Sequence, residues 1–459
     1  MVTISLIGAG SVVFSKQLMV DILSFHELED CTFCLMDIDK ERLSMIEKVA
    51  RMFIEQRKSK VRIVTTMSID EAVKQATYVI NLVQVGGFTA TKIDFDIPRS
   101  YGVKQTIADT MGIGGIFRGL RTIPVLDQIC RAIEQYNPKA VLLNYTNPMA
   151  ILSQYVLQKY EGIQYVGLCH SVQTTSKQLA LYMNIPYDEL QVKVAGINHQ
   201  SWFLELKHNK EDCYPRLFAL KKKLDDDPSY VPEHLFSYSG NDAWFRENFK
   251  DSAAQTFATD KIRFEMLKRL GYYVTESSEH NAEYCPYFIK DQTLIEKYSI
   301  PIDEYIRRCE INLKEFAEMK QQIKNGEELH VDTSQEYAGY IIHSIETGQE
   351  RTINGNVLNT HLIENLPQGC CVEVPCLINR NGVQPTHIGN LPSQLAAYNR
   401  TNVNVQMLAV EAAITKKKEH IYHAVMLDPL ACSLLNLEQM WQMTDELFDA
   451  HGAAVSYLK

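Results

Sequence analysis

A cysteine and a histidine stand at the ends of two apolar segments, about thirty residues apart in the chain. Cys169 lies in the stretch GLCHS and His199 in the stretch GINH. A thiolate and an imidazole that meet at neighbouring strand ends can hold a divalent metal ion and leave positions open for a substrate. A buried cysteine beside a helix-capping histidine gives the same pattern, so the spacing alone leaves both interpretations open.

The stretch GAGS at residues 8–11 has the form of a dinucleotide-binding turn. It directly follows an apolar run and precedes a helix-compatible segment. Glycine lets the backbone turn sharply and approach a diphosphate, and the next helix N-terminus offers unpaired N–H groups. Asp37, 27 residues after Gly10, suits a carboxylate that accepts from a ribose hydroxyl. Val13 replaces the third glycine of the fingerprint, and a tight turn without a ligand is the alternative.

Two further polar groups are candidates for the same cleft. Asn147, in NYTNP, follows a strand-like run directly. Side chains at the carboxyl end of such a strand face the ligand crevice, but Asn147 could instead cap the helix that Pro148 can begin. Asp109, in QTIADT, is a second candidate, for which a turn or a helix cap is the alternative.

The elements that must position these residues alternate along about the first 200 residues. Near-continuously apolar strands separated by amphipathic segments, such as Glu41–Gln56 and Thr122–Tyr136, indicate a parallel sheet covered on both faces. The expected fold class is α/β, with a doubly wound parallel sheet. The predicted strands are Val2–Ile7, Thr32–Met36, Val61–Thr65, Tyr78–Val83, Val141–Asn144 and Tyr165–Leu168.

A less regular region begins near Gln191 and predicts a second, α+β domain. Helical periodicity covers Asp303–Lys324, strands with turns are expected in Val357–Pro392, and Asn402–His451 is mostly helical in composition. We therefore expect a dinucleotide-binding domain at residues 1–190 and an α+β domain at residues 191–459.

Composition excludes several classes of protein. Of the 459 residues, 46% are hydrophobic, so a buried core is expected and disorder is not. The 46 Lys and Arg against 56 Asp and Glu give a net charge of −10, which disfavours nucleic-acid binding. No apolar run reaches the roughly 20 residues that span a bilayer, and the N-terminus lacks signal-peptide features, so we expect a cytoplasmic protein without a membrane partner.

The eleven cysteines are an odd number in a cytosolic-looking chain, so a disulfide framework is not expected. Cys31-x-x-Cys34 has the spacing of a redox or zinc pair, but it lies in a strand-like run without a second such pair. Most of the thiols are expected to be small core residues.

Read in order, the motifs resemble glycoside hydrolase family 4, the NAD- and manganese-dependent glycosidases. They are GAGS, MDID, QTIADTMGIGGIFRGLRTIP, NYTNP, GLCHS, GINH and VTESSEHNAEY, and the match also includes LPQGCCVEV and QPTHIGNLP. The resemblance runs through nearly the whole chain. Within the family, CHS, GINH and VTESSEH look most like the α-galactosidases, or melibiases.

The resemblance implies a hydrolysis that differs from the usual two-carboxylate mechanism. NAD+ takes a hydride from C3 of the sugar, a base removes the acidified C2 proton, and the aglycone leaves from C1. Water then adds, the steps reverse, and no net redox change results. The expected substrate is a small α-galactoside of the melibiose type.

The resemblance also assigns residues to the cofactors and the sugar. Cys169 and His199 match the metal-ligand positions, and Asn147 matches a sugar-binding asparagine. The cofactor positions are matched by Gly8, Gly10, Ser11 and Asp37. A thiolate is a soft ligand for the harder Mn2+, so weak binding is expected. Family resemblance further implies that residues 191–459 form a substrate and oligomerisation domain and that the protein is a homo-oligomer, either a dimer or a tetramer.

The acid and the base of the reaction are assigned less directly. In several relatives an aspartate just after the ligand cysteine is the leaving-group acid. Here His170 stands at that position, where an imidazolium can do the same work, and Asp109 is a competing candidate. For the C2 base we predict Asp260, with Arg263 orienting substrate oxygens; a helix N-cap at Asp260 is the alternative. The fallback bases are Tyr272 and Tyr273, and Glu279 and His280 are expected near the sugar without a defined role.

Three other hypotheses about the function are compatible with the sequence. The same mechanism could act on α-glucosides, α-glucuronides or α-galacturonides, and a uronate would call for an additional Arg or Lys near C6. A lactate- or malate-type dehydrogenase would have a similar fold but would leave Cys169 and His199 without a purpose. A non-catalytic NAD-binding sensor is the third reading.

Overall fold

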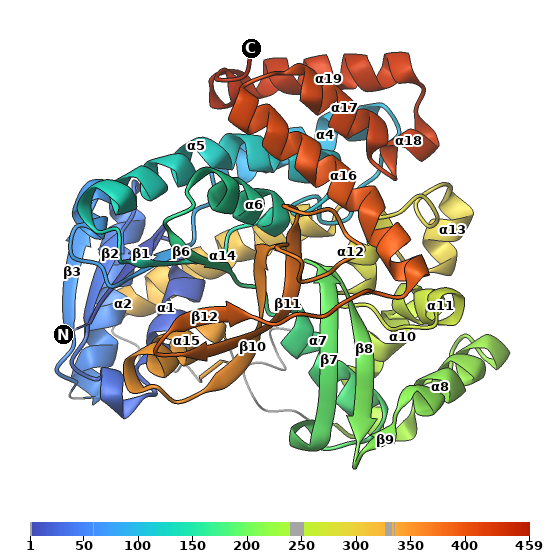
Figure 1. Ribbon diagram of the computed structural model, residues 1–459, viewed down its shortest axis with the longest axis horizontal. Helices are drawn as coiled ribbons and strands as arrows, with labels where there is room; N and C mark the ends of the chain where they lie inside the picture. The colour runs from blue at the N-terminus through green and yellow to red at the C-terminus, as the bar shows by residue number, and fades with distance from the viewer. Residues whose placement is uncertain (1, 58, 239–251, 326–332, 335) are drawn as a thin grey trace.

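A twelve-stranded mixed sheet runs through the protein (Figure 1). The computed structural model describes residues 2–57, 59–238, 252–325, 333–334 and 336–459. The strands are β1 (Thr3–Ile7), β2 (Thr32–Met36), β3 (Arg62–Thr66), β4 (Tyr78–Asn81), β5 (Val141–Asn144), β6 (Gln164–Gly167), β7 (Leu190–Ile197), β8 (Gln200–His208), β9 (Glu211–Asp212), β10 (Arg351–Leu358), β11 (Cys371–Asn379) and β12 (Gly382–Pro385).

The first six strands are parallel and lie in the order β3-β2-β1-β4-β5-β6. This order reverses direction between β1 and β4, which is where doubly wound sheets form a ligand crevice. The predicted α/β fold class and all six predicted strands are confirmed. Because the strands are parallel, the residues after β1, β5 and β6 meet at one edge of the sheet.

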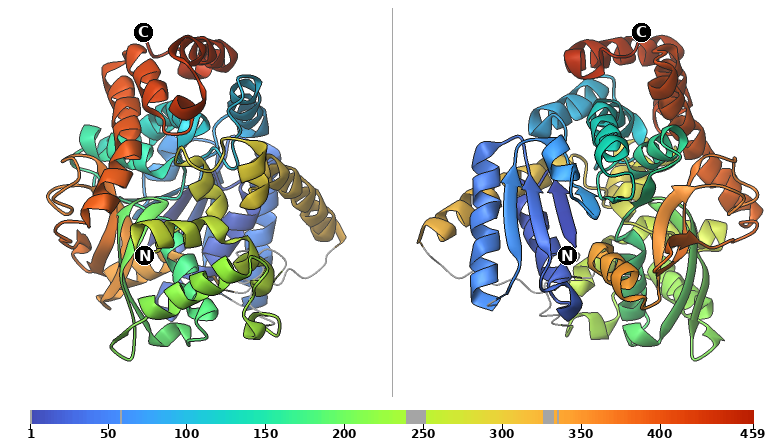
Figure 2. Two further views of the ribbon diagram at one scale, coloured as in Figure 1. Left: turned by 90° about the vertical axis from the view of Figure 1, so that its right-hand side faces the viewer. Right: turned by 60° about the vertical axis from the view of Figure 1, so that its left-hand side comes forward.

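Helices cover both faces of this sheet (Figure 2). Helices α1, α2 and α15 pack side by side, and α3, α5 and α6 form a second group. The helices are α1 (Val12–Ile22), α2 (Lys40–Arg57), α3 (Ile69–Val73), α4 (Gly87–Ser100), α5 (Gly112–Tyr136), α6 (Met149–Lys159), α7 (Ser171–Tyr182), α8 (Tyr214–Asp226), α10 (Ala253–Thr259), α11 (Lys261–Leu270), α12 (Ser278–Glu283), α13 (Gln292–Lys297), α14 (Glu304–Asn325), α15 (Tyr337–Thr347), α16 (Ser393–Thr415), α17 (Glu419–Leu427), α18 (Ala431–Leu434) and α19 (Leu437–His451).

Helix α5 begins at Gly112, earlier than the amphipathic pattern predicted. Its first turns are rich in glycine, which lowers helix propensity. A Cβ at Gly114 would lie 2.5 Å from the carbonyl oxygen of Ala108, and one at Gly115 would lie 2.8 Å from the backbone of Thr110. The glycines therefore let the helix pack directly against the loop that carries Asp109.

The strands of the second half extend the first sheet instead of forming a separate one. Asn356 of β10 pairs with Gly167 of β6, and Glu373 of β11 pairs with Gly196 of β7. Helix α16 packs on α5 and α6 (Figure 1). The main hydrophobic core accordingly contains residues from both halves. The predicted division at residue 190 lies at the start of β7 and stays a prediction.

All eleven cysteines lie in the described residues and none forms a disulfide, as expected. Ten of them are buried, including Cys31 and Cys34. Among the described residues, no helix is both long and apolar enough to cross a membrane.

Glu373 lies at the junction of the two groups of strands and is fully buried. Its carboxylate accepts from Ser201 Oγ at 2.8 Å and from Asn356 Nδ2 at 3.5 Å. Burial raises the pKa of Glu373 from 4.5 to about 7, although these hydrogen bonds lower it. The folded state holds the proton of Glu373 more tightly than the unfolded state does. The stabilisation from this proton is therefore fully present below the unfolded pKa of 4.5 and is lost as the pH rises through the folded pKa of about 7.

We expect Glu373→Gln to remove this pH dependence. Between about pH 5 and about pH 7, the unfolding free energy of the wild type should fall relative to the variant by on the order of 1 kcal/mol per pH unit. Urea unfolding of metal-free protein at a series of pH values measures the two slopes. Glu364→Gln, at an exposed position, is the control and should keep the wild-type slope. Equal slopes for wild type and Glu373→Gln would contradict the prediction.

Candidate active site

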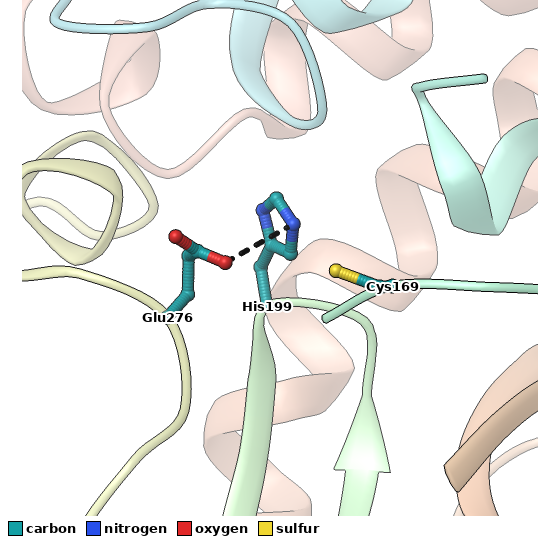
Figure 3. A group of neighbouring side chains, drawn as sticks. All are labelled: Cys169, His199 and Glu276. Atoms are coloured by element: carbon teal, nitrogen blue, oxygen red, sulfur yellow. Dashed lines mark ion pairs between the residues drawn. The ribbon is translucent and has the colours of Figure 1, made fainter. Parts of the chain in front are cut away.

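Three potential metal ligands converge at the carboxyl edge of the sheet. The ligand atoms of Cys169, His199 and Glu276 all lie within 4.8 Å of one another, and the described residues contain one such group. Figure 3 shows them approaching from three separate segments. Cys169 follows β6, His199 follows β7, and Glu276 lies between α11 and α12. The structure thus brings the predicted pair together and adds a carboxylate that the sequence analysis missed.

The imidazole of His199 is oriented as a neutral ligand. Its Nδ1 lies 2.9 Å from the hydroxyl of Tyr284, and its Nε2 lies 3.5 Å from Oε2 of Glu276. Burial lowers the pKa of His199 to about 4, so the ring is neutral at neutral pH. When the Tyr284 hydroxyl accepts the Nδ1 proton, the Nε2 lone pair faces the carboxylate, and a cation between them would satisfy both.

Glu276 lies on a turn that is hydrogen-bonded to the beginning of β8. Val274 bridges to Trp202, and the backbone N–H of Thr275 donates to the carbonyl of Ser201 at 2.8 Å. Glu276 itself has a φ of +66°, a left-handed conformation that is uncommon for this residue type. Such a conformation needs support from its surroundings, and it is often found at functional sites.

The charge of Glu276 favours a cation at this place. Burial raises the pKa of its carboxyl, whereas the neighbouring histidines, when they are protonated, and the guanidinium of Arg263 lower the pKa below its usual value. The carboxylate also lies 3.4 Å from Nδ1 of His280, whose ring packs edge-to-face on His199. His280 is therefore a neighbour of the metal group.

Cys169 is buried, and its thiol is protonated in the absence of a metal. Burial raises the pKa of Cys169 above its ordinary value, and the nearby carboxylates of Glu373 and Glu276 raise it further. A divalent ion would displace this proton. The donor set of sulfur, nitrogen and oxygen fits a divalent transition metal, and the carboxylate of Glu276 makes the site harder, and so more suitable for Mn2+, than the predicted pair alone.

Asn147 and Asp109 lie together beside this group. The Asn147 amide donates to Asp109 Oδ2 at 3.2 Å, whereas its Oδ1 is buried without a partner among the described residues. No side-chain bond caps α6, so the Oδ1 of Asn147 is available to a ligand. Burial raises the pKa of Asp109, but the guanidinium of Arg118 lowers it, and the resulting pKa lies below the usual value. Asp109 is therefore an ionised hydrogen-bond acceptor.

Glu283, at the end of α12, fixes the loop that carries Asp109. Its two oxygens accept from the consecutive backbone N–H groups of Thr106, Ile107 and Ala108 at 2.8–3.2 Å. The next residue is Tyr284, which contacts His199. The end of one short helix thus positions two parts of the site.

His170 directly follows Cys169 and is half exposed. Its Nδ1 lies 3.2 Å from the carboxylate of Glu336, at the start of α15. The imidazole precedes α7 without capping it through its side chain. A carboxylate neighbour stabilises the imidazolium, which suits a proton donor.

Asp260 and Arg263 form a buried ion pair. The pair is not in the convergent metal group, and all the polar atoms of the two side chains have partners among the described residues. The predicted base and the predicted substrate-orienting guanidinium therefore have no free atoms for these roles. Tyr273 is also fully buried and donates to Asp260, while Tyr272 packs on Tyr214.

The glycine turn brings the backbone at Gly10 close to the carboxylate of Asp37. Gly8 has a φ of +87°, and a Cβ at Gly10 would lie 2.6 Å from Oδ2 of Asp37. The N–H of Gly10 donates to that oxygen at 2.7 Å. Ser11 is exposed at the start of α1, and the side chain of Val13 is 42% exposed, so a third glycine is not needed for packing.

The comparisons with known proteins agree on one family. The family 4 glycosyl hydrolase model matches residues 3–185, and the model of the C-terminal domain of the same family matches residues 194–431. The α-galactosidase of Bacillus subtilis (strain 168) is 43% identical over 452 residues, which cover 98% of each chain.

Solved structures support the same assignment of the fold. The crystal structure of lplD from Bacillus subtilis has a TM-score of 0.85 at 25% identity and covers 97% of this chain and 99% of its own. A 6-phospho-α-glucosidase from gut microorganisms, solved with NAD and Mn2+, has a TM-score of 0.76 at 19% identity, covering 99% of this chain and 98% of its own. From the family matches and the nearly full-length identity, this chain belongs to the family 4 glycosyl hydrolases and is a glycosidase.

Proposed function

We propose that this glycosidase hydrolyses melibiose-type α-galactosides, with NAD and Mn2+ as cofactors. The observation that carries the substrate is the 43% identity to an α-galactosidase over 98% of both chains. The cofactors are supported by two features of this chain, the glycine turn at β1 and the ligand group at β6 and β7.

The residues present fit both cofactors. Gly8, Gly10 and Ser11 would face the diphosphate, and Asp37 would accept from a ribose hydroxyl. Cys169, His199 and Glu276 would hold the metal ion. When bound, NAD supplies a reversible hydride acceptor, and the divalent ion polarises sugar oxygens and favours loss of the C2 proton.

The surrounding side chains have roles that their contacts support. Asn147 directs its unpartnered Oδ1 to a sugar hydroxyl while its amide stays on Asp109. His170, with Glu336 behind it, donates a proton to the departing aglycone oxygen. All the polar atoms of Asp260 and Arg263 already have partners, so we propose that both residues are structural supports and assign neither the C2 base nor substrate binding to them.

The charges near the site favour a neutral hexose over a uronate. Three arginines lie around it, and each has an acidic partner. Arg263 pairs with Asp260, Arg308 with Glu279 at 2.7 Å, and Arg118 lies near Asp109. A sugar carboxylate would have to compete with these acids for a guanidinium, whereas galactose hydroxyls need only hydrogen bonds.

Hydrolysis of p-nitrophenyl α-galactoside under reducing conditions tests the proposal, with NAD+ and Mn2+ omitted in turn. We expect release of nitrophenol only when both are present, without accumulation of NADH. The matched α-glucoside and α-galacturonide serve as controls for the sugar. Turnover of one of these alone would keep the mechanism and change the substrate, and hydrolysis without either cofactor would refute the mechanism.

The cytoplasmic location and the homo-oligomeric state expected from the sequence remain predictions of this proposal. Light scattering after size-exclusion chromatography would measure the mass in solution and so distinguish a dimer or a tetramer from a monomer.

A further inference from the structure

The carboxylate of Asp260 is fully engaged by buried donors. Its Oδ1 accepts from Arg263 Nε at 2.6 Å and from Ser278 Oγ at 2.6 Å. Its Oδ2 accepts from Arg263 Nη2 and from the hydroxyls of Tyr182 and Tyr273 at 2.5–3.1 Å. Five hydrogen bonds fill the capacity of an ionised carboxylate. Asp260 therefore holds its surroundings in place and keeps Arg263 oriented.

Arg263 uses all five of its N–H groups. Besides Nε and one Nη2 proton on Asp260, Nη2 donates to Gln178 Oε1 at 2.7 Å. Nη1 donates to Thr175 Oγ1 at 3.2 Å and to the backbone carbonyl of Glu276 at 2.5 Å. A guanidinium has five N–H donors in a planar fork, so none remains for a substrate.

Apart from Asp260, the partners of Arg263 belong to two segments that carry or adjoin metal ligands, helix α7 and the turn that contains Glu276. Thr175 and Gln178 lie on α7, which begins two residues after Cys169. On the other side, the backbone N–H of Arg263 donates to Ser278 Oγ at 3.2 Å, so Arg263 holds the turn at the carbonyl of Glu276 and again two residues later. The left-handed backbone conformation of Glu276 directly precedes these two contacts.

We propose that Arg263 is a positioning residue for the metal group, because it ties the turn of Glu276 to the helix that follows Cys169. Asp260 serves Arg263 as its fixed counter-ion. The inference rests on the proposed function, since it takes Cys169, His199 and Glu276 as the ligands of a divalent ion. It predicts that Arg263 controls metal affinity without touching the metal.

Arg263→Lys is the main test, because lysine keeps the positive charge beside Asp260 but cannot make the five planar bonds. The full-length protein is titrated with Mn2+ alone. The electron paramagnetic resonance signal of the free ion, recorded at each step, gives the Kd for Mn2+. We expect Mn2+ binding to weaken about 10- to 100-fold, the range for partners that orient metal ligands. The Kd for NAD+ should stay within about 3-fold of the wild-type value.

Arg121→Lys is the matched control. Arg121 is also buried, makes a bidentate pair with Asp94 at 2.6 and 3.0 Å, and donates to the carbonyl of Val85. It contacts none of the three ligands in these bonds. If Arg121→Lys weakened Mn2+ binding as much as Arg263→Lys, the effect would be a general loosening and the proposal would be overturned.

A double-mutant cycle tests whether Arg263 acts through Glu276. In a Glu276→Ala background, Arg263→Lys should change the Mn2+ affinity by less than about 3-fold. An undiminished effect in that background would overturn the proposal. Should Arg263→Lys fail to fold, Thr175→Val removes a single bond between Arg263 and α7, and we expect about 3- to 10-fold weaker Mn2+ binding.

The outcomes separate this inference from the proposed function. Mn2+ binding by the wild type that is unchanged in Arg263→Lys would refute the positioning role and leave the proposed function standing. Failure of the wild type to bind Mn2+ would refute both.

Discussion

Replacing Cys169 with serine should reduce α-galactoside turnover by roughly 10³-fold, because metal assistance supplies several kcal/mol of transition-state stabilisation. A serine hydroxyl is a poor substitute for a thiolate ligand, and only His199 and Glu276 would remain to hold the ion. NAD+ affinity should be unchanged, since the glycine turn follows another strand. Steady-state kinetics with saturating NAD+ and Mn2+, together with calorimetric titration of NAD+, measure the two effects.

Cys432→Ser is the control for loss of a thiol as such. Cys432 is exposed, and its Sγ donates only to the carbonyl of Pro429 among the hydrogen bonds described. This variant should keep wild-type turnover. Near-wild-type activity of Cys169→Ser would exclude Cys169 as a required metal ligand, whatever the behaviour of His199.

Replacing Gly10 with alanine should weaken NAD+ binding by about 10- to 100-fold. The added Cβ would lie 2.6 Å from Oδ2 of Asp37 and 2.8 Å from Cβ of Arg42, so the carboxylate must move. Its hydrogen bond to the Gly10 N–H would be lost, together with its position toward a ribose hydroxyl. Hydrogen bonds to charged groups contribute about 1.5–3 kcal/mol, which corresponds to this range of affinity. Calorimetric titration of NAD+ gives the affinity directly.

Gly162→Ala provides a matched glycine substitution. Gly162 is exposed, and a Cβ there would meet nothing within 4 Å. Its NAD+ affinity should equal that of the wild type, and Mn2+ affinity should be unchanged in both variants. If Gly10→Ala bound NAD+ as tightly as Gly162→Ala, the dinucleotide would have to bind elsewhere.

Much of the first half could be predicted from the sequence, because its signals are local. Apolar runs such as Thr32–Met36 are buried on both faces of a parallel sheet, and this burial leaves a continuous hydrophobic pattern. The positions after β1, β5 and β6 then follow from the topology. Parallel strands place their carboxyl ends at one edge, which is why Gly10, Asn147 and Cys169 could be grouped before the structure was known.

The path of the second half could not be predicted in the same way. Its strands β10 and β11 pair with β6 and β7 through single residue pairs, Asn356 with Gly167 and Glu373 with Gly196. These contacts join segments far apart in the chain, and periodicity within one segment carries no information about its partner. The glycine-rich start of α5 likewise needed the loop against which it packs.

The sequence by itself determined the family resemblance, the parallel sheet and the pair Cys169 and His199, since strand ends and motif order are local properties. Only the tertiary structure decided which carboxylate joins them. The stretch VTESSEH offers two glutamates, and the turn fastened to β8 brings Glu276 to the ligands while Glu279 pairs with Arg308. For Asp260 and Arg263, the family resemblance suggested chemistry, but the surrounding donors and acceptors occupy every polar atom. Whether a polar group is free to react depends on its partners, and those come from distant parts of the chain.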